Sequence, residues 1–115
     1  MGRDILEMPF AGVYPLLVRK AERKGRTRDE VDTLTSWLLG YTKDEIASAL
    51  EGETSYGDFF RYAPAPNPLA ERVGGRICDV KIEEIESPIM RSIRRLDKLV
   101  DELAKGKPVE KLLPA

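Results

Sequence analysis

The residues of this chain whose types could do chemistry gather in one basic run, R-K-A-E-R-K-G-R-T-R, which spans residues 19–28. The run holds six cations and one anion, so its net charge is +5. Lysine and arginine at this density can neutralise the phosphates of a nucleic acid or pair with the carboxylates of an acidic protein. The candidate anion- or partner-binding residues are Arg19, Lys20, Arg23, Lys24, Arg26 and Arg28.

A nucleic-acid function would require these cations to reach a phosphate backbone. A helix, a glycine turn and a second helix are predicted here, which is the arrangement of a helix-turn-helix corner. However, Asp29, Glu30 and Asp32 follow directly, and their charges would repel a phosphate near the second helix. We therefore favour an acidic protein partner, and nucleic-acid binding through the same corner is the alternative.

Part of the positive charge also has a structural explanation. Arg23 and Lys24 fall in the last turn of the predicted helix, where the helix dipole stabilises a cation by about 0.3–1 kcal/mol. Arg26 and Arg28 can pair with the acids that follow them or with those of residues 83–86. An excess of about two or three cations remains beyond these needs.

Charge is segregated along the rest of the chain. Residues 29–58 hold eight acids and one lysine, a net charge of −7. Residues 91–115 hold seven cations and four acids, a net charge of +3. The total of −1 therefore hides local fields that could steer a partner.

The composition excludes several common catalytic sites. The chain has no histidine and one cysteine, Cys78, which removes Ser-His-Asp or Cys-His catalysis, histidine-ligated metals and an internal disulfide. No glycine motif of the Rossmann or P-loop type is present. We predict no catalytic residue, cofactor or metal ligand. An enzyme or small-ligand protein that uses only arginines and carboxylates is the second alternative function.

The size and composition are those of one globular domain, predicted to span residues 1–115. The 115 residues are 42% hydrophobic and 34% charged, and a chain of this length can bury about two thirds of its unfolded surface. No apolar stretch has the length of a signal-peptide core or a membrane span. We expect a cytoplasmic protein with no membrane partner.

Three helices are predicted in the first half of the chain. Pro15 and Gly25 indicate a first helix from residue 14 or 15 to residue 24, because proline favours a helix start and glycine a left-handed end. Two capping boxes follow, T-R-D-E at Thr27 and T-K-D-E at Thr42. Each predicts a helix that ends at the next glycine. A short helix is predicted after S-Y-G-D, with its aromatic neighbours in the core.

The second half of the chain is predicted to contain a loop, a strand and the longest helix. Residues 63–75 are rich in proline and glycine and indicate a loop with one brief turn. Ser87 as cap and Pro88 in the first turn predict a helix that ends at Gly106. The segment P-V-E-K-L-L predicts a further turn or two near the C-terminus.

The segment R-I-C-D-V-K-I alternates between apolar and polar residues and predicts a strand with Cys78 on its buried side. A single strand is not stable alone, so it needs a partner. The N-terminal segment R-D-I-L-E-M could pair with it in a two-stranded ribbon. A second copy of the chain could also supply the partner strand, which would give a homodimer.

Several segments together resemble a bacterial family of unknown function, domain of unknown function family 2200. They are M-P-F-A-G-V-Y-P, K-A-E-R-K-G-R-T with E-V-D, W-L-L-G-Y, F-F-R-Y-A-P-A-P-N-P, I-E-S-P-I-M-R-S-I-R-R-L-D-K-L-V-D-E-L-A-K-G-K and E-K-L-L. Ser87 stands where this family typically has Asp before the helix-starting proline, and the aromatic expected near Arg95 is absent. The resemblance implies a mainly helical, orthogonally packed domain of bacterial cytoplasmic origin, and it implies no activity and no site residues.

These observations combine into one prediction. The fold is all-α, or mainly α: a small orthogonal bundle of four main helices with short extra helices and a two-stranded β ribbon as an option. The function is that of a non-catalytic binding or protein-interaction module that uses the basic helix-turn-helix-like corner.

Overall fold

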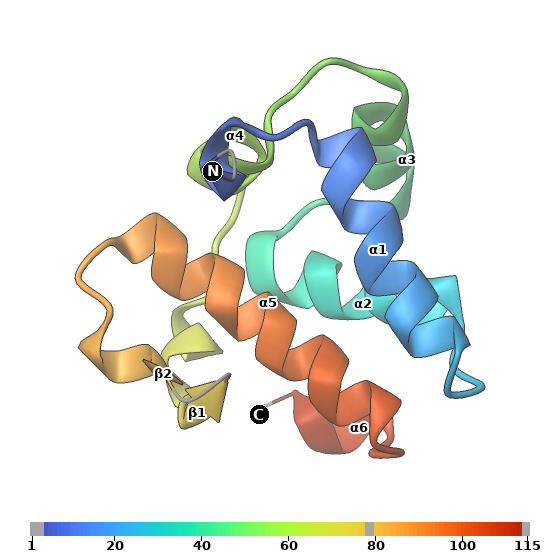
Figure 1. Ribbon diagram of the computed structural model, residues 1–115, viewed down its shortest axis with the longest axis vertical. Coiled ribbons are helices and arrows are strands. Elements are labelled where there is room, and N and C mark those ends of the chain that lie inside the picture. Colours follow the sequence, from blue (N-terminus) through green and yellow to red (C-terminus); the bar gives the residue numbers. More distant parts are fainter. Residues whose placement is uncertain (1–3, 78–79, 114–115) are drawn as a thin grey trace.

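The computed structural model describes residues 4–77 and 80–113, and these residues are mainly helical (Figure 1). Three 3-10 turns, η1 (Ile5–Glu7), η2 (Pro68–Arg72) and η3 (Ile82–Glu84), connect the longer elements. The six α-helices of the described residues are α1 (Phe10–Glu22), α2 (Arg28–Leu39), α3 (Lys43–Glu51), α4 (Tyr56–Arg61), α5 (Pro88–Ala104) and α6 (Val109–Leu112).

Both predicted capping boxes are confirmed. The backbone N–H of Glu30 donates to Thr27 Oγ1 at 3.2 Å, and the carboxylate of Glu30 accepts from the backbone N–H of Thr27 at 3.0 Å. Thr42 and Glu45 make the same reciprocal pair at the start of α3. These caps satisfy backbone donors that have no partner inside the helix, so both helices begin where the sequence predicted.

Helix α1 begins earlier than predicted. It starts at Phe10, and Pro15, which was expected in the first turn, lies inside the helix. The backbone N–H of Phe10 donates to the carbonyl of Thr54 at 2.9 Å, and the buried Phe10 ring stacks on Phe59 with centroids 4.0 Å apart. The stability gained from this hydrogen bond and ring stacking offsets the loss of the backbone hydrogen bond that Pro15 cannot donate inside the helix. The helix also ends at Glu22, two residues before the predicted end at residue 24, and Arg23 is its C-cap. Gly25 has the predicted left-handed conformation, with a φ of +80°.

Among the described residues, the predicted two-stranded ribbon between the N-terminal segment and residues 76–82 is not formed. The N-terminal segment forms η1 and then hydrogen-bonds to residues 54–56. The two-residue strands β1 (Arg76–Ile77) and β2 (Val80–Lys81) instead pair antiparallel with each other. Cys78, predicted on the buried side of a longer strand, lies outside the described residues.

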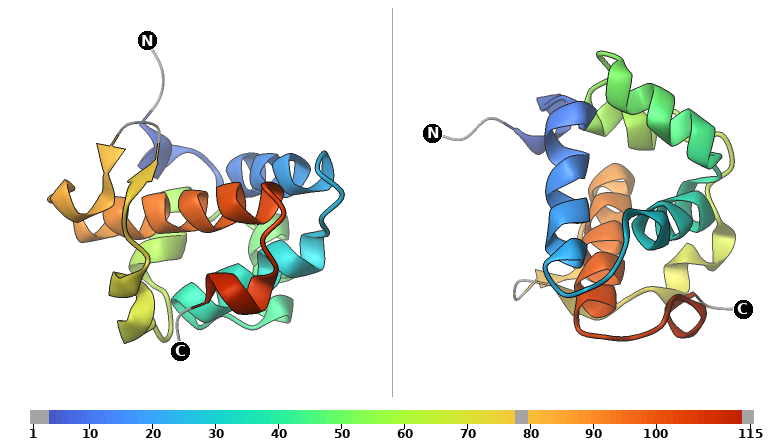
Figure 2. Two further views of the ribbon diagram at one scale, coloured as in Figure 1. Left: turned by 90° about the horizontal axis from the view of Figure 1, so that it is seen from below. Right: turned by 90° about the vertical axis from the view of Figure 1, so that its right-hand side faces the viewer.

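Helix α5 lies at the centre of the fold and packs against α1, α2 and α4. Ile93, Leu96 and Leu103 on its apolar face are at most 1% exposed. Figures 1 and 2 show α1 and α5 running side by side, with their C-terminal ends at the same end of the molecule, while α2 crosses them. None of the helices in the described ranges is long and apolar enough to cross a bilayer.

The aromatic residues after S-Y-G-D were all expected in the core, and this is correct for two of three. Phe59 and Phe60 are buried, and Phe60 packs edge-on against Tyr56. Tyr62, however, is 71% exposed. It is the C-cap of α4, where the chain turns away from the core.

Candidate functional site

The structure divides the six predicted site residues into two groups of three. The first group is paired within the molecule. Lys20 Nζ lies 3.1 Å from Asp101 Oδ1. Arg26 Nη2 lies 2.6 Å from Glu30 Oε2, and Arg28 Nε lies 3.5 Å from Asp32 Oδ2. Arg26 and Arg28 therefore pair with the acidic segment that follows them, as predicted.

The second group consists of Arg19, Arg23 and Lys24. All three side chains are exposed, and within residues 4–77 and 80–113 none of them has an ion-pair partner. Arg23 is the C-cap of α1 and Lys24 follows it in the turn to Gly25. Their positive charges face the carbonyl end of α1 and the solvent, where they are available to an anion.

Arg26 is the least available cation of the basic run. It is half-buried, and its Nε is buried without a hydrogen-bond partner in the described structure. Partial burial of Glu30 acts to raise the pKa of that carboxyl, but the hydrogen bonds from Arg26 and Thr27 outweigh it, so the pKa of Glu30 is lowered. Arg26 is thus a structural partner of α2.

The C-terminal end of α5 adds cations that the sequence did not place at this site. Asp101 accepts from Lys20 and also from Lys105, whose Nζ is 3.0 Å from Asp101 Oδ2. Glu102 is likewise shared by Lys98 at 3.3 Å and Lys107 at 2.7 Å. Four lysines therefore meet two carboxylates.

The pKa shifts follow this sharing. The hydrogen bond from Lys107 leads the effects that lower the pKa of Glu102, against slight desolvation. Slight burial acts to raise the pKa of Asp101, but Lys105 and Lys20 lower it overall. The hydrogen bond to Asp101 raises the pKa of Lys105. The shifts of Glu102, Asp101 and Lys105 therefore all favour the charged form of the side chain.

We define the cationic end as the four lysines and two carboxylates described above, together with the exposed side chains of Arg23 and Lys24 at the end of α1. Its six cations and two acids give a net charge of +4. A hollow of about 510 Å³ between α1 and α5 is lined by Lys20, Lys24 and Lys105, with Asp101 and Ala104. The residues of the cationic end are Lys20, Arg23, Lys24, Lys98, Asp101, Glu102, Lys105 and Lys107.

Two of these ion pairs, Lys98 with Glu102 and Asp101 with Lys105, join residues four apart on one helical stretch and follow from helical spacing. The pair of Lys20 with Asp101, by contrast, joins residues that are far apart in the sequence. No local pattern signals such a contact. The positive charge of residues 91–115 was visible, but only the packing of α5 beside α1 brings it to the basic corner.

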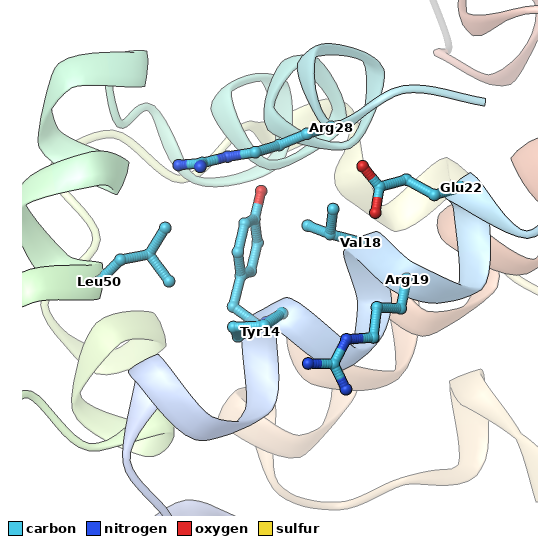
Figure 3. A pocket seen from close by; sticks show the side chains of 7 residues that line it. Tyr14, Val18, Arg19, Glu22, Arg28 and Leu50 are labelled. Carbon is cyan, nitrogen blue, oxygen red and sulfur yellow. The ribbon is translucent and has the colours of Figure 1, made fainter.

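Arg19 and Arg28 line a separate, smaller pocket of about 160 Å³ over Tyr14 (Figure 3). In Figure 3 the two guanidinium groups lie on opposite sides of the Tyr14 ring and do not converge. Tyr14 Oη donates to Asp32 Oδ1 at 2.6 Å and contacts Thr35 Oγ1 at 3.0 Å. The pocket is smaller than the usual ligand site of about 300–1,000 Å³, and the buried polar groups beneath it are already hydrogen-bonded.

Burial, together with the hydrogen bond to Asp32, raises the pKa of Tyr14 far above its ordinary value. The hydroxyl therefore stays protonated and donates to the buried carboxylate. This network connects α1 to α2 beneath the corner and was not predicted from the sequence. Its role is to satisfy Asp32, which is only 7% exposed.

Within the described residues 4–77 and 80–113, no group of three or more Cys, Asp or Glu side chains is placed to hold a metal ion.

Two comparisons with known proteins found a similar family or structure. A family model described as "Uncharacterized protein conserved in bacteria (DUF2200)" matches residues 4–114. The crystal structure of the uncharacterized protein SP1917 is similar in fold, with a TM-score of 0.93 and 48% sequence identity over 98% of this chain and 93% of that chain. No match is found among curated proteins.

Proposed function

The chain belongs to the DUF2200 family of uncharacterized proteins conserved in bacteria, and we propose that it is a non-catalytic interaction module whose cationic end binds an acidic surface of a partner protein. The observation that carries this proposal is the sharing of two carboxylates among four lysines. Beside them stand Arg23 and Lys24, which have no ion-pair partner within the described residues. An acidic partner would neutralise this excess and add long-range attraction to the encounter.

The surroundings of the cationic end favour a protein over a nucleic acid. The next helix, α2, carries Asp29 and Glu30 in its first turn, and the side chain of Asp29 is 75% exposed although it pairs with Lys43. Phosphates that followed a DNA groove onto α2 would meet these carboxylates. A compact cluster of carboxylates on a partner protein could contact the cationic end without reaching the acids of α2.

The proposal is tested by binding fluorescent poly-L-glutamate and a DNA duplex of equal charge, each at two salt concentrations. The variant removes three exposed cations of the cationic end: Arg23→Ala, Lys24→Ala and Lys105→Ala. We expect it to bind poly-L-glutamate about tenfold more weakly than wild type, because charges at a docking surface set the electrostatic attraction. Fluorescence anisotropy measures the affinity.

The matched control removes three exposed cations elsewhere, by Lys43→Ala, Arg61→Ala and Lys81→Ala, so the net charge falls by the same amount. Its affinity for poly-L-glutamate should stay within about twofold of wild type. Equal losses in the two triple variants would show that only total charge matters and would refute the proposal. Tight, steeply salt-dependent binding to DNA alone would favour the nucleic-acid alternative.

A further inference from the structure

A second hollow, of about 370 Å³, lies on the other half of α5, beside the proline-rich segment. Pro66, Pro68 and Pro88 contribute its apolar walls, and α5 contributes Arg91 and Arg95. Figure 2 shows residues 62–72 passing beside the first half of α5. This hollow, called the arginine groove below, is separate from the cationic end, because positions 92 and 105 of a helical stretch lie about 20 Å apart.

The two arginines of the groove are held in place by neutral groups. Arg91 Nη1 donates to the carbonyls of Ile85 at 2.6 Å and Glu86 at 3.1 Å. Arg95 Nε donates to the carbonyl of Val73 at 3.3 Å. In the described part of the chain neither guanidinium has a carboxylate within ion-pair distance, and Arg91 Nη2 and both terminal nitrogens of Arg95 have no hydrogen-bond partner.

This arrangement carries an electrostatic cost. Arg91 and Arg95 are four residues apart on one helix, where like charges repel each other. Both are partly buried. Desolvation, followed by the charge of Arg91, lowers the pKa of Arg95, and the charges of Glu71 and Glu83 oppose this effect only in part. Two fixed, partly desolvated cations without a carboxylate partner would be stabilised by a bound anion.

Neutral donors line the same groove. Asn67 lines the groove, and its Oδ1 accepts from the backbone N–H of Leu69 at 2.9 Å, while its Nδ2 has no hydrogen-bond partner in the described residues. The hydroxyl of Ser92 has no partner in the described residues and stands between the two arginines in the sequence of α5. Glu71 is the single acid of the lining. The groove therefore offers mainly donors, and its ligand must supply acceptors.

We propose that the arginine groove binds a small phosphate monoester, with its phosphate between Arg91 and Arg95 and its carbon skeleton against the prolines. A phosphate dianion balances two guanidinium charges and accepts several hydrogen bonds at once, whereas a carboxylate would balance only one charge. The volume of the groove lies in the range of small-molecule sites. Glu71 can accept from a hydroxyl of the ligand.

Glycerol 3-phosphate is the probe for a free monoester, and thermal unfolding is the readout. We expect it to raise the Tm of wild type above that in sodium chloride of equal ionic strength, because a ligand that binds only the folded state stabilises it. Arg91→Gln with Arg95→Gln should weaken the affinity about tenfold or more in calorimetry. Arg61→Gln on α4 removes one exposed cation and should leave the affinity unchanged. No phosphate-specific shift in wild type would refute the proposal.

Since Arg95 also holds a loop carbonyl, a second variant avoids the arginines. Ser92→Asp places a carboxylate beside both guanidinium groups, so it should raise the Tm without ligand and abolish the response to glycerol 3-phosphate. Ser92→Asn, of similar size and neutral, should keep the response within a few-fold. A full response in Ser92→Asp would contradict the proposed position of the phosphate.

The source of the phosphate group is settled by a third probe, a phosphoserine peptide. We expect it to bind no more tightly than glycerol 3-phosphate, and tighter binding of the peptide would overturn the assignment to a small molecule. The variant of Arg23, Lys24 and Lys105 should keep the full response to glycerol 3-phosphate. The proposals for the arginine groove and for the cationic end can therefore be refuted independently of each other.

Discussion

The basic side chains at the corner between α1 and α2 carry the same charge, but only some of them have an acidic partner among the described residues. Arg26 and Arg28 pair with acids one turn further along α2, and Arg26 is half-buried. Arg23 and Lys24 come from the same basic run and are exposed. A cation contributes to binding only if the fold has not already neutralised it, so the run of six predicted residues reduces to fewer available ones.

Two carboxyls of α5 should change stability with pH in opposite directions. Burial raises the pKa of Asp97, and Arg94 at 3.3 Å only partly opposes this effect. The folded state therefore binds a proton more tightly than the unfolded chain, and stability falls as pH rises from the unfolded pKa of about 3.9 through the folded pKa. Asp97→Asn cannot ionise, so it should gain stability relative to wild type from about pH 4 to about pH 7. Urea unfolding at both pH values measures this difference.

Glu102→Gln provides the comparison of opposite sign. Lys107 and Lys98 lower the pKa of Glu102, so its contribution to stability is present above the unfolded pKa of about 4.3 and is lost as pH falls through the folded pKa. The variant should lose stability relative to wild type as pH rises from about pH 2.5 to about pH 5.5, because this interval reaches below the unfolded pKa. Urea unfolding at these two pH values measures the loss. If both variants followed wild type in parallel, the proposed difference between the two carboxyls would be wrong.

Among the elements, the helix ends are determined by different forces. The starts of α2 and α3 are local, because the capping boxes need only residues three apart. The start of α1 depends on Thr54 and Phe59, which are distant in sequence. The C-cap of α2, Gly40, favours glycine for two reasons. Its φ is +85°, and a Cβ there would lie 2.6 Å from the Cβ of Ala65.

Gly40→Ala and Gly25→Ala separate these two reasons. Both positions have a positive φ, but a Cβ at Gly25 would meet no atom within 4 Å. We expect Gly25→Ala to lower the free energy of unfolding by about 1–2 kcal/mol, the cost of the left-handed backbone alone. Gly40→Ala should cost about 3 kcal/mol or more, since the loop at Ala65 must also move. Equal losses in urea unfolding would show that the contact with Ala65 is unimportant.

The whole molecule is organised around α5, which contributes to both proposed sites. Its apolar face forms the centre of the core, its first half lines the arginine groove, and its last turn joins the cationic end. The two sites are thus held on one rigid helix that the core fixes in place. Sites built on such elements are more precisely positioned than sites on loops.

Leu96→Ala tests this central position against a leucine on the surface. Leu96 is 0% exposed, whereas Leu16 on α1 is 55% exposed. We expect Leu96→Ala to reduce the free energy of unfolding by about 2–5 kcal/mol through lost burial and a cavity. Leu16→Ala should stay within about 0.5 kcal/mol of wild type. Chemical denaturation of the two variants compares the same side-chain truncation, and similar losses would contradict the description of the core.

Much of the helical fold could be predicted because its signals are local. Thr27, Thr42 and Ser87 lie beside the backbone groups that they cap, and the i,i+4 pairs of α5 follow from helix geometry. Local signals did not predict the start of α1, the exposure of Tyr62 or the pairing of β1 with β2. Each depends on which distant segment lies nearby, and propensity is overridden there by packing.

The candidate sites show the same division. The sequence by itself determined that the chain is mainly helical, lacks histidine chemistry and carries excess positive charge between residues 19 and 28. The pairs of Arg26 and Arg28 with α2 are local and follow from helical spacing. Only the tertiary structure decided that Lys20 is also neutralised, because its partner Asp101 lies on α5. It also decided that Arg91 and Arg95 face a proline-walled groove without a carboxylate partner in the described residues. Electrostatic interactions depend on distance in space, and sequence spacing specifies that distance only within a helical turn or two.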